Sequence, residues 1–138
     1  MNKEELRQMI RELLQEEAGT CPVKLRKLRE IAVSPEDRLD TGDKNHQVYT
    51  HDIFTLEESP RLGAGIMEMR ATEFLWHLNY DEIDYVIEGE LTIKYGETSV
   101  TAKEGEVILI PKGSDIRFCV PNSARFLYVT YPADWQNG

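Results

Sequence analysis

The last two-thirds of the chain consists of short segments that have the composition of β-strands. Each segment is rich in β-branched or aromatic residues, and Gly, Pro, Asn or Asp separates it from the next. We predict strands at 48–50, 53–56, 65–69, 73–76, 83–87, 91–95, 99–102, 107–110, 116–120 and 125–131, with Gly89 turning the chain after the fifth. Many short strands at this spacing are typical of an all-β sandwich or barrel.

Residues 2–17 are the one stretch with a helical pattern, and Asn2 is placed to cap it. Apolar residues recur there at steps of three and four and form one stripe. The stripe comprises Leu6, Met9, Ile10, Leu13 and Leu14. An isolated helix of this length is marginal in water, so the stripe needs a surface. That surface is either the chain's own domain or a dimer mate, or a groove on another protein.

The residues after this helix are expected to end it and to connect it to the β-rich part. The predicted stop is Gly19, Thr20, Cys21 and Pro22. Turn-forming residues and weak periodicity follow as far as residue 44. We therefore divide the chain into a helix over 1–19, a linker over 20–44 and a barrel over 45–138.

The charge balance excludes one class of partner. The 138 residues include 16 Lys or Arg and 25 Asp or Glu, for a net charge of −9, whereas a nucleic-acid-binding protein needs a clustered basic surface. No apolar run is long enough to cross a bilayer, and the N-terminus lacks the apolar core of a signal peptide. Cys21 and Cys119 lack the spacing of a zinc site or a disulfide framework. These features predict a soluble cytoplasmic protein that binds neither nucleic acid nor membrane.

Residues 74–91 hold the densest set of carboxylates beside apolar strand residues. Glu82, Asp84 and Glu88 fall on one side of the predicted strand, and Ile83 and its alternate neighbours fall on the other. Periodicity alone favours a half-buried strand whose acids lie in water. The alternative is that the acids line a cavity.

Two motifs of fixed spacing frame this region. Glu82 is followed by six residues and then Gly89, while Gly105 is followed by five residues and then Pro111-x-Gly113. Together they resemble the paired motifs of the cupin superfamily, whose fold is a double-stranded β-helix, or jelly-roll, barrel. The resemblance implies an all-β cupin barrel with a short N-terminal helix, and it turns the Glu82 side of the strand toward the barrel interior.

The cupin motifs supply three histidines and a glutamate to one metal ion. Carried over position by position, Glu82 takes the glutamate position and His77 the second histidine position. Leu75 and Ile116 stand at the other two positions and cannot ligate a metal. Only His77 and Glu82 remain as metal candidates, so no confident metal site is predicted. The other two histidines of the chain would have to converge with His77 to restore one.

Four stretches carry a closer resemblance. They are 54–69, 78–89, 110–114 and 126–135. They resemble the ethanolamine-utilisation protein EutQ family. The resemblance implies a metal-poor, homodimeric cupin that works within or at the bacterial microcompartment that metabolises ethanolamine. Members of the family are linked to ATP-dependent acetate phosphorylation and to microcompartment assembly.

The N-terminal helix is similar to the encapsulation peptides found at the ends of microcompartment cargo enzymes. This similarity implies that the apolar stripe binds a shell or cargo protein. The residues expected to make that contact are Leu6, Ile10, Leu13 and Leu14.

The cupin resemblance also nominates the residues of an interior site. Glu82 and Asp84 are the catalytic candidates. The candidates for lining a ligand pocket are His77, Tyr80, Glu88 and Lys112. Carboxylates that crowd one cavity of low dielectric cannot all ionise without cost, so one is expected to hold a proton, to be offset by a cation, or to act as a general acid or base.

Two functions are compatible with these residues. The first is acetate kinase, which converts acetate and ATP to acetyl phosphate and ADP; it would take a small carboxylate as ligand and use Mg²⁺ with ATP. The absence of a Walker-type phosphate-binding loop from the sequence argues against it. The alternative is a non-catalytic cupin scaffold that links cargo to the microcompartment shell.

Overall fold

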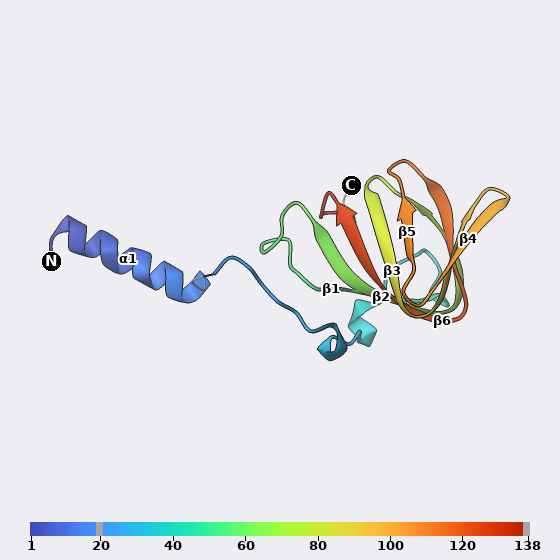
Figure 1. The fold of residues 1–138 in the computed structure, drawn as a ribbon, viewed down its shortest axis with the longest axis horizontal. Coiled ribbons are helices and arrows are strands. Elements are labelled where there is room, and N and C mark those ends of the chain that lie inside the picture. Colours follow the sequence, from blue (N-terminus) through green and yellow to red (C-terminus); the bar gives the residue numbers. More distant parts are fainter. Residues whose placement is uncertain (19–20, 137–138) are drawn as a thin grey trace.

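The computed structural model describes residues 1–18 and 21–136 and shows one α-helix followed by a barrel of antiparallel strands (Figure 1). The helical elements are α1 (Lys3–Ala18) and two short 3-10 helices, η1 (Leu28–Glu30) and η2 (Pro35–Asp37). The strands are β1 (Gln47–Asp52), β2 (Gly63–His77), β3 (Asp81–Tyr95), β4 (Thr98–Lys103), β5 (Val107–Ile110) and β6 (Asp115–Tyr131). The predicted helix stop at Gly19 and Thr20 lies outside the described residues. The strand predicted at 53–56 is wrong, because the chain leaves β1 in a bend there and enters a turn at residue 56.

Three strands are much longer than predicted, because the chain bends without leaving the sheet. Each of β2, β3 and β6 joins two predicted segments. In β3 the bend falls at Gly89, which has a φ of 80°, so Gly89 lies inside the strand and the turn predicted there is wrong. In β2 the bend falls at Ala71, with a φ of 45°, where the Thr72 hydroxyl accepts a hydrogen bond from the Gln47 N–H (3.0 Å) and donates one to the Arg70 carbonyl (2.8 Å).

The bent strands build two layers of one jelly-roll barrel. The strand order is β1-β2-β6-β3-β4, and β5 pairs with the first half of β3. The second half of β3 pairs with β4, so the same strand contributes to both layers. In the described part of the chain β4 and β5 are not paired with each other. The predicted barrel is therefore present, but hydrogen bonds do not close it.

Apolar and aromatic side chains fill the space between the layers. Phe118 stacks on Phe74 and Phe126, with ring centroids 5.2 Å and 6.4 Å apart. Trp135 lies edge-on to Trp76 and completes the aromatic cluster at one end of the barrel. The alternation along β3 buries every second side chain from Glu82 to Val86. The interior of the barrel is thus a packed core rather than an open channel.

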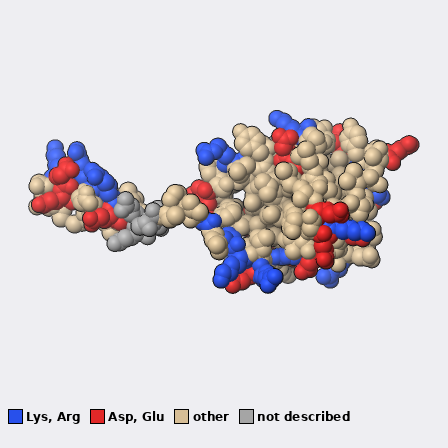
Figure 2. Space-filling model, viewed as in Figure 1, with Lys and Arg blue, Asp and Glu red and all other residues tan. Residues whose placement is uncertain are grey.

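The outer face of β3 and β5 keeps large apolar side chains exposed. Ile83 and Tyr85 on β3 lie opposite Leu109 and Val107 on β5, and all four are exposed. Figure 2 shows an extended area of the barrel surface without charged side chains, bordered by charged groups. The homodimer stays a prediction.

The segment before the barrel divides into a helix that stands apart and a part that lies on the barrel. In Figure 1 α1 extends away from the strands, and it contacts no other described helix or strand. By contrast, the carbonyl groups of Leu28 and Ile31 accept hydrogen bonds from Arg125, and the Leu39 N–H donates to Val48. About half of the predicted linker therefore packs against the strands. No helix of the described residues is long and apolar enough to cross a membrane.

The bend in β3 yields a prediction about stability. A Cβ at Gly89 would collide with the Ser123 carbonyl, and the φ of 80° disfavours any other residue. We expect Gly89→Ala to lower the free energy of unfolding by about 3 kcal/mol, as strain and overpacking add. Gly105 has a similar φ of 83° but open space around it, so Gly105→Ala should cost only about 1 kcal/mol. Urea unfolding of both variants checks this, and equal losses would contradict it.

Candidate functional site

Two carboxyl groups lie inside the barrel. Glu82 and Asp84 are two residues apart on β3 and therefore face the same side, with exposed fractions of 5% and 0%. On β6, Thr130 lies opposite Glu82, and Tyr128 lies opposite Asp84. The structure thus places both predicted catalytic candidates in the interior, which favours the cavity interpretation of the alternation over the solvent interpretation.

The carboxyl pair lacks the hydrogen-bond partners that buried polar groups normally have. Oε2 of Glu82, both Oδ atoms of Asp84 and Oγ1 of Thr130 are buried without a partner among the described residues. Burial raises the pKa of Glu82 from 4.5 to about 7. Burial, and then the charge of Glu82, raises the pKa of Asp84 well above its ordinary value. At neutral pH the pair therefore holds at least one proton.

Aromatic side chains leave almost no free space beside Glu82. The cavity there has a volume of about 10 Å³, which is room for about one water molecule. Tyr80 is buried in the cavity wall, and its hydroxyl accepts a hydrogen bond of 2.7 Å from the indole Nε1 of Trp76. Burial raises the pKa of the Tyr80 phenol, so Tyr80 stays neutral and available as a hydrogen-bond donor. As the side chains stand, nothing larger than water fits beside Glu82.

A larger hollow, which we call the vestibule, lies next to this interior cavity. It has a volume of about 470 Å³. It is lined by Glu36, Asp37, Arg38, Leu39, Asp40, Thr50, Trp76 and Gln136. Leu39, Thr50 and Trp76 line both spaces and so form the wall between them. Asp37 anchors the segment in front of this wall, because it accepts a hydrogen bond from the Ser34 N–H (2.8 Å) and pairs with His51 (3.2 Å).

His77 does not reach the carboxyl pair. Its ring is exposed and lies 2.6 Å from Asp115 and 3.0 Å from Asn79. At the end of β2 it is Phe74 and Trp76 that turn inward, while Leu75 and His77 turn outward. The expectation that His77 lines the interior pocket is therefore wrong, because the alternation of β2 places it on the outer side of the strand. His77 and Glu82 do not form a metal site.

Glu88 and Lys112 also lie outside the interior. The register of β3 shifts between Val86 and Glu88, which turns Glu88 to the outer surface although it shares the parity of Glu82. The side chain of Lys112 is exposed, and its backbone N–H donates to Asp81 (2.8 Å). Both were expected in the pocket, and both expectations are wrong.

The remaining histidines do not converge on a metal site. His46 contacts Thr41 (2.7 Å) and Asp43 (3.5 Å), whereas His51 pairs with Asp37. Residues 1–18 and 21–136 contain no group of three His, Cys, Asp or Glu side chains arranged to hold a metal ion.

Sequence reasoning missed the partners of the carboxyl pair on the neighbouring strands. Gly63 and Gly65 on β2 lie opposite Thr130 and Tyr128, and a Cβ on either glycine would collide with those side chains. The missing side chains make room for the Tyr128 ring, whose hydroxyl donates to Asp52 (3.0 Å). The Gly-x-Gly spacing before an apolar segment was the available signal.

Known proteins resemble the chain over most of its length. A family model described as "Ethanolamine utilisation protein EutQ" matches residues 1–137. A protein named acetate kinase EutQ from Clostridioides difficile is 63% identical over 109 residues, which cover 79% of this chain and 69% of the relative. Another of that name from Salmonella typhimurium is 46% identical over 70% of this chain, but the match spans only 42% of the relative's length.

Solved structures agree on the fold. The structure of the Clostridium difficile EutQ protein superposes with a TM-score of 0.81 and 60% identity, and the match covers 83% of each chain. The cupin domain of Schizosaccharomyces pombe Cnp3 superposes with a TM-score of 0.59 at 16% identity, over 78% of this chain and 73% of that one. The barrel is therefore a cupin barrel.

The buried carboxyl pair predicts a pH-dependent stability. Because the pKa of Glu82 is raised to about 7 in the folded state, the unfolded chain releases a proton that the folded chain retains. The contribution of Glu82 to the free energy of unfolding is therefore greatest below about pH 4.5. It falls by about 3 kcal/mol in total as the pH rises from there through about 7. In Glu82→Gln the fall should be smaller, and the part due to the buried Asp84, whose pKa is also raised by burial, should remain.

Urea unfolding at several pH values between 4.5 and 8 measures the effect. The exposed Glu104 is the matched control, so Glu104→Gln should follow the parent protein at every pH. Parallel pH profiles for the parent and Glu82→Gln would show that Glu82 does not titrate in this way.

Proposed function

Because the chain belongs to the EutQ family of ethanolamine-utilisation proteins, we propose that it is an acetate kinase, which transfers a phosphoryl group between ATP and acetate. The observation that carries the proposal is the high sequence identity between this chain and a protein named acetate kinase EutQ, over about four-fifths of the chain. In the reaction an acetate oxygen bonds to the γ-phosphorus of ATP as the bond to the bridging oxygen breaks, which gives acetyl phosphate and ADP. Acetate is already ionised, so the protein needs to position the reactants and offset their charge.

We place the nucleotide in the vestibule, since the cavity beside Glu82 is too small to hold it. The volume of about 470 Å³ lies within the range of small-molecule sites. Glu36, Asp37 and Asp40 offer carboxylate oxygens there, and Mg²⁺ prefers oxygen ligands, of which the protein usually supplies one or two and the substrate phosphates others. Bound with ATP, Mg²⁺ would offset the charge of the phosphoryl oxygens.

The carboxyl pair is suited to bind acetate when Glu82 carries a proton. A protonated carboxyl donates a hydrogen bond to a carboxylate, whereas an ionised one repels it. Tyr80 adds a neutral hydroxyl to the same cavity. Acetate would reach Glu82 only when Leu39 or Trp76, which separate the cavity from the vestibule, moves aside.

This mechanism predicts the effect of removing the Glu82 carboxyl. Glu82→Leu should remain folded, because an apolar side chain avoids burying a polar group without a partner. Acetyl-phosphate formation from ATP, acetate and Mg²⁺ should fall about 100-fold. In the parent protein kcat/KM for acetate should fall as the pH rises above about 7, where Glu82 loses its proton.

Glu90→Leu is the matched control, because Glu90 lies on the same strand but is exposed. It should retain the parent activity when both variants are prepared identically. Equal activity in Glu82→Leu and Glu90→Leu would remove the carboxyl pair from the reaction. No activity in any preparation would favour the second function below.

A specific observation supports a non-catalytic scaffold as the second candidate. The α1 residues Leu6, Ile10, Leu13 and Leu14 have exposed fractions of 49%, 48%, 52% and 59%. A helix that leaves such a stripe uncovered is suited to bind a groove on another protein. We propose that α1 binds a microcompartment shell or cargo protein and brings the chain to the compartment.

The scaffold proposal predicts that α1 is needed for localisation but not for folding. Ile10→Glu/Leu13→Glu should abolish co-localisation of a fluorescent fusion with microcompartments, because charges replace the apolar stripe. The thermal unfolding midpoint should stay within about 1 °C of the parent value, since α1 packs on no other described element. Gln8→Glu/Arg11→Glu, which adds two acids on the side of α1 opposite the stripe, is the control. Normal localisation of the stripe variant would contradict the proposal.

A further inference from the structure

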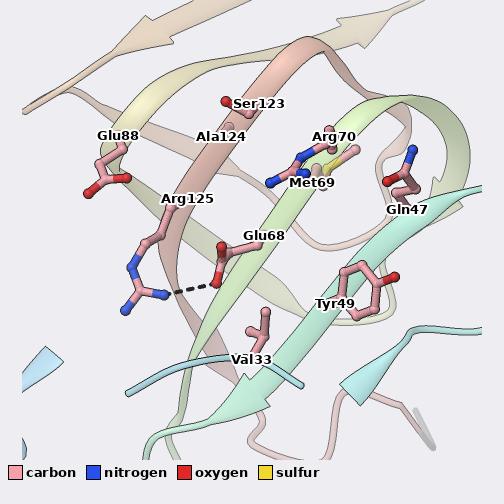
Figure 3. Close-up of a pocket in the computed structure, with 10 residues that line it drawn as sticks. All are labelled: Val33, Gln47, Tyr49, Glu68, Met69, Arg70, Glu88, Ser123, Ala124 and Arg125. Carbon is pink, nitrogen blue, oxygen red and sulfur yellow. Dashed lines mark hydrogen bonds and ion pairs between the residues drawn. The ribbon is translucent and has the colours of Figure 1, made fainter. Parts of the chain in front are cut away.

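A second polar hollow, the outer hollow, lies on the outer face of the barrel where β2, β3 and β6 bend (Figure 3). It has a volume of about 280 Å³. Two rows of side chains that lie opposite one another on neighbouring strands line it. The first row is Tyr49, Glu68, Arg125 and Glu88, and the second is Gln47, Arg70 and Ser123. The outer hollow shares no lining residue with the interior cavity or the vestibule.

One of the two arginines of the outer hollow already has partners within the protein. Arg125 pairs with Glu68 (3.1 Å) and donates hydrogen bonds to the carbonyls of Leu28 (2.9 Å) and Ile31 (2.8 Å). Figure 3 shows Arg125 and Glu68 directed toward one another. The ion pair offsets both charges, and the two hydrogen bonds fix the segment that borders the hollow.

The second arginine, Arg70, has no side-chain partner among the described residues. Within residues 1–18 and 21–136 no hydrogen bond or ion pair engages the side chain of Arg70, Gln47, Tyr49 or Ser123. The four side chains carry donor groups of different kinds, a guanidinium, an amide and two hydroxyls. The carboxylate of Glu88 also has no ion-pair partner among these residues and is the one uncompensated acid in the hollow. Arg70 and Glu88 are thus its two unpaired charges.

The backbone holds Arg70 and Gln47 beside each other. The Thr72 hydroxyl is bonded to the Arg70 carbonyl and to the Gln47 N–H, and the two residues lie opposite each other on β2 and β1. Ala71, between Arg70 and Thr72, has a φ of 45°, a conformation that costs a non-glycine residue free energy and that is frequent in ligand-binding segments. Because the backbone is held here, binding of a ligand needs to order only the side chains.

We infer that the outer hollow binds a small oxyanion, with Arg70 as its charged anchor. A guanidinium matches the two oxygens of a carboxylate or a phosphate, and Gln47, Tyr49 and Ser123 can donate to the remaining lone pairs. A volume of about 280 Å³ is at the small end of ligand sites, which suits an anion of a few heavy atoms. The negative charge of Glu88 repels the anion and keeps the affinity of the hollow for it modest. This site is separate from the one proposed for phosphoryl transfer, and binding alone tests it.

Amide chemical shifts of the full chain, measured during titration, test the inference. Sodium acetate and inorganic phosphate are the two probes, in separate samples, with sodium chloride holding the ionic strength constant. We expect saturable shifts at Gln47, Tyr49, Arg70 and Ser123. If only acetate saturates the shifts, the hollow is a carboxylate site. If only phosphate does, it is a phosphate site, and if both do, it is a general oxyanion site.

Two substitutions should move the affinity in opposite directions. Arg70→Gln should weaken binding about tenfold or more, since a charged hydrogen-bonded anchor is lost. Glu88→Gln should strengthen binding about threefold, because a like charge is removed from an exposed site. Arg61→Gln, at an exposed arginine outside the hollow, should leave the affinity unchanged. Shifts that do not saturate with either probe, or that are the same in Arg70→Gln, would overturn the inference.

Discussion

The continuity of three bent strands is the constraint on which the rest of the structure depends. Because β2, β3 and β6 each belong to both layers, neither layer can form without the other. The bends require a backbone with positive φ at Gly89 and Ala71. They also decide which side chains reach the interior, since each irregularity reverses the alternation beyond it. The positions of the carboxyl pair and of the outer hollow both follow from where the bends fall.

The sequence predicted the parts of the fold and site that depend on local alternation and motif spacing. Glu82 and Asp84 are buried together because no irregularity interrupts β3 between them. The same reasoning failed at Glu88, which lies beyond a register shift, and at His77, whose strand turns its other side inward. A period of two residues cannot show a bulge, because the bulge depends on hydrogen bonds to a neighbouring strand. For the same reason, the sequence pattern did not predict that short strands join into long ones.

In the described part of the chain, polar side chains without hydrogen-bond partners occur both in the interior and on the outer face, but they are tolerated for different reasons. Inside, Glu82 and Asp84 are kept from water, and three of their four carboxyl oxygens have no hydrogen-bond partner among the described residues. The pair therefore retains at least one proton at neutral pH, which lowers the cost of burial. Outside, solvent can hydrate the side chains of the outer hollow, so leaving them without partners costs little. A carboxyl pair retained in a cupin interior without a full set of metal ligands favours a role for its protons over a role in coordination.

The open seam between β4 and β5 has a consequence for behaviour in solution. Each strand at a seam presents backbone N–H and C=O groups that no neighbouring strand uses, and such edges can join one molecule to another. Here the edges are short, with six residues in β4 and four in β5, and every molecule carries a net charge of −9. Mutual repulsion of like-charged molecules keeps the edges apart at low ionic strength. The colloidal stability of the protein therefore depends on the salt around it as well as on its fold.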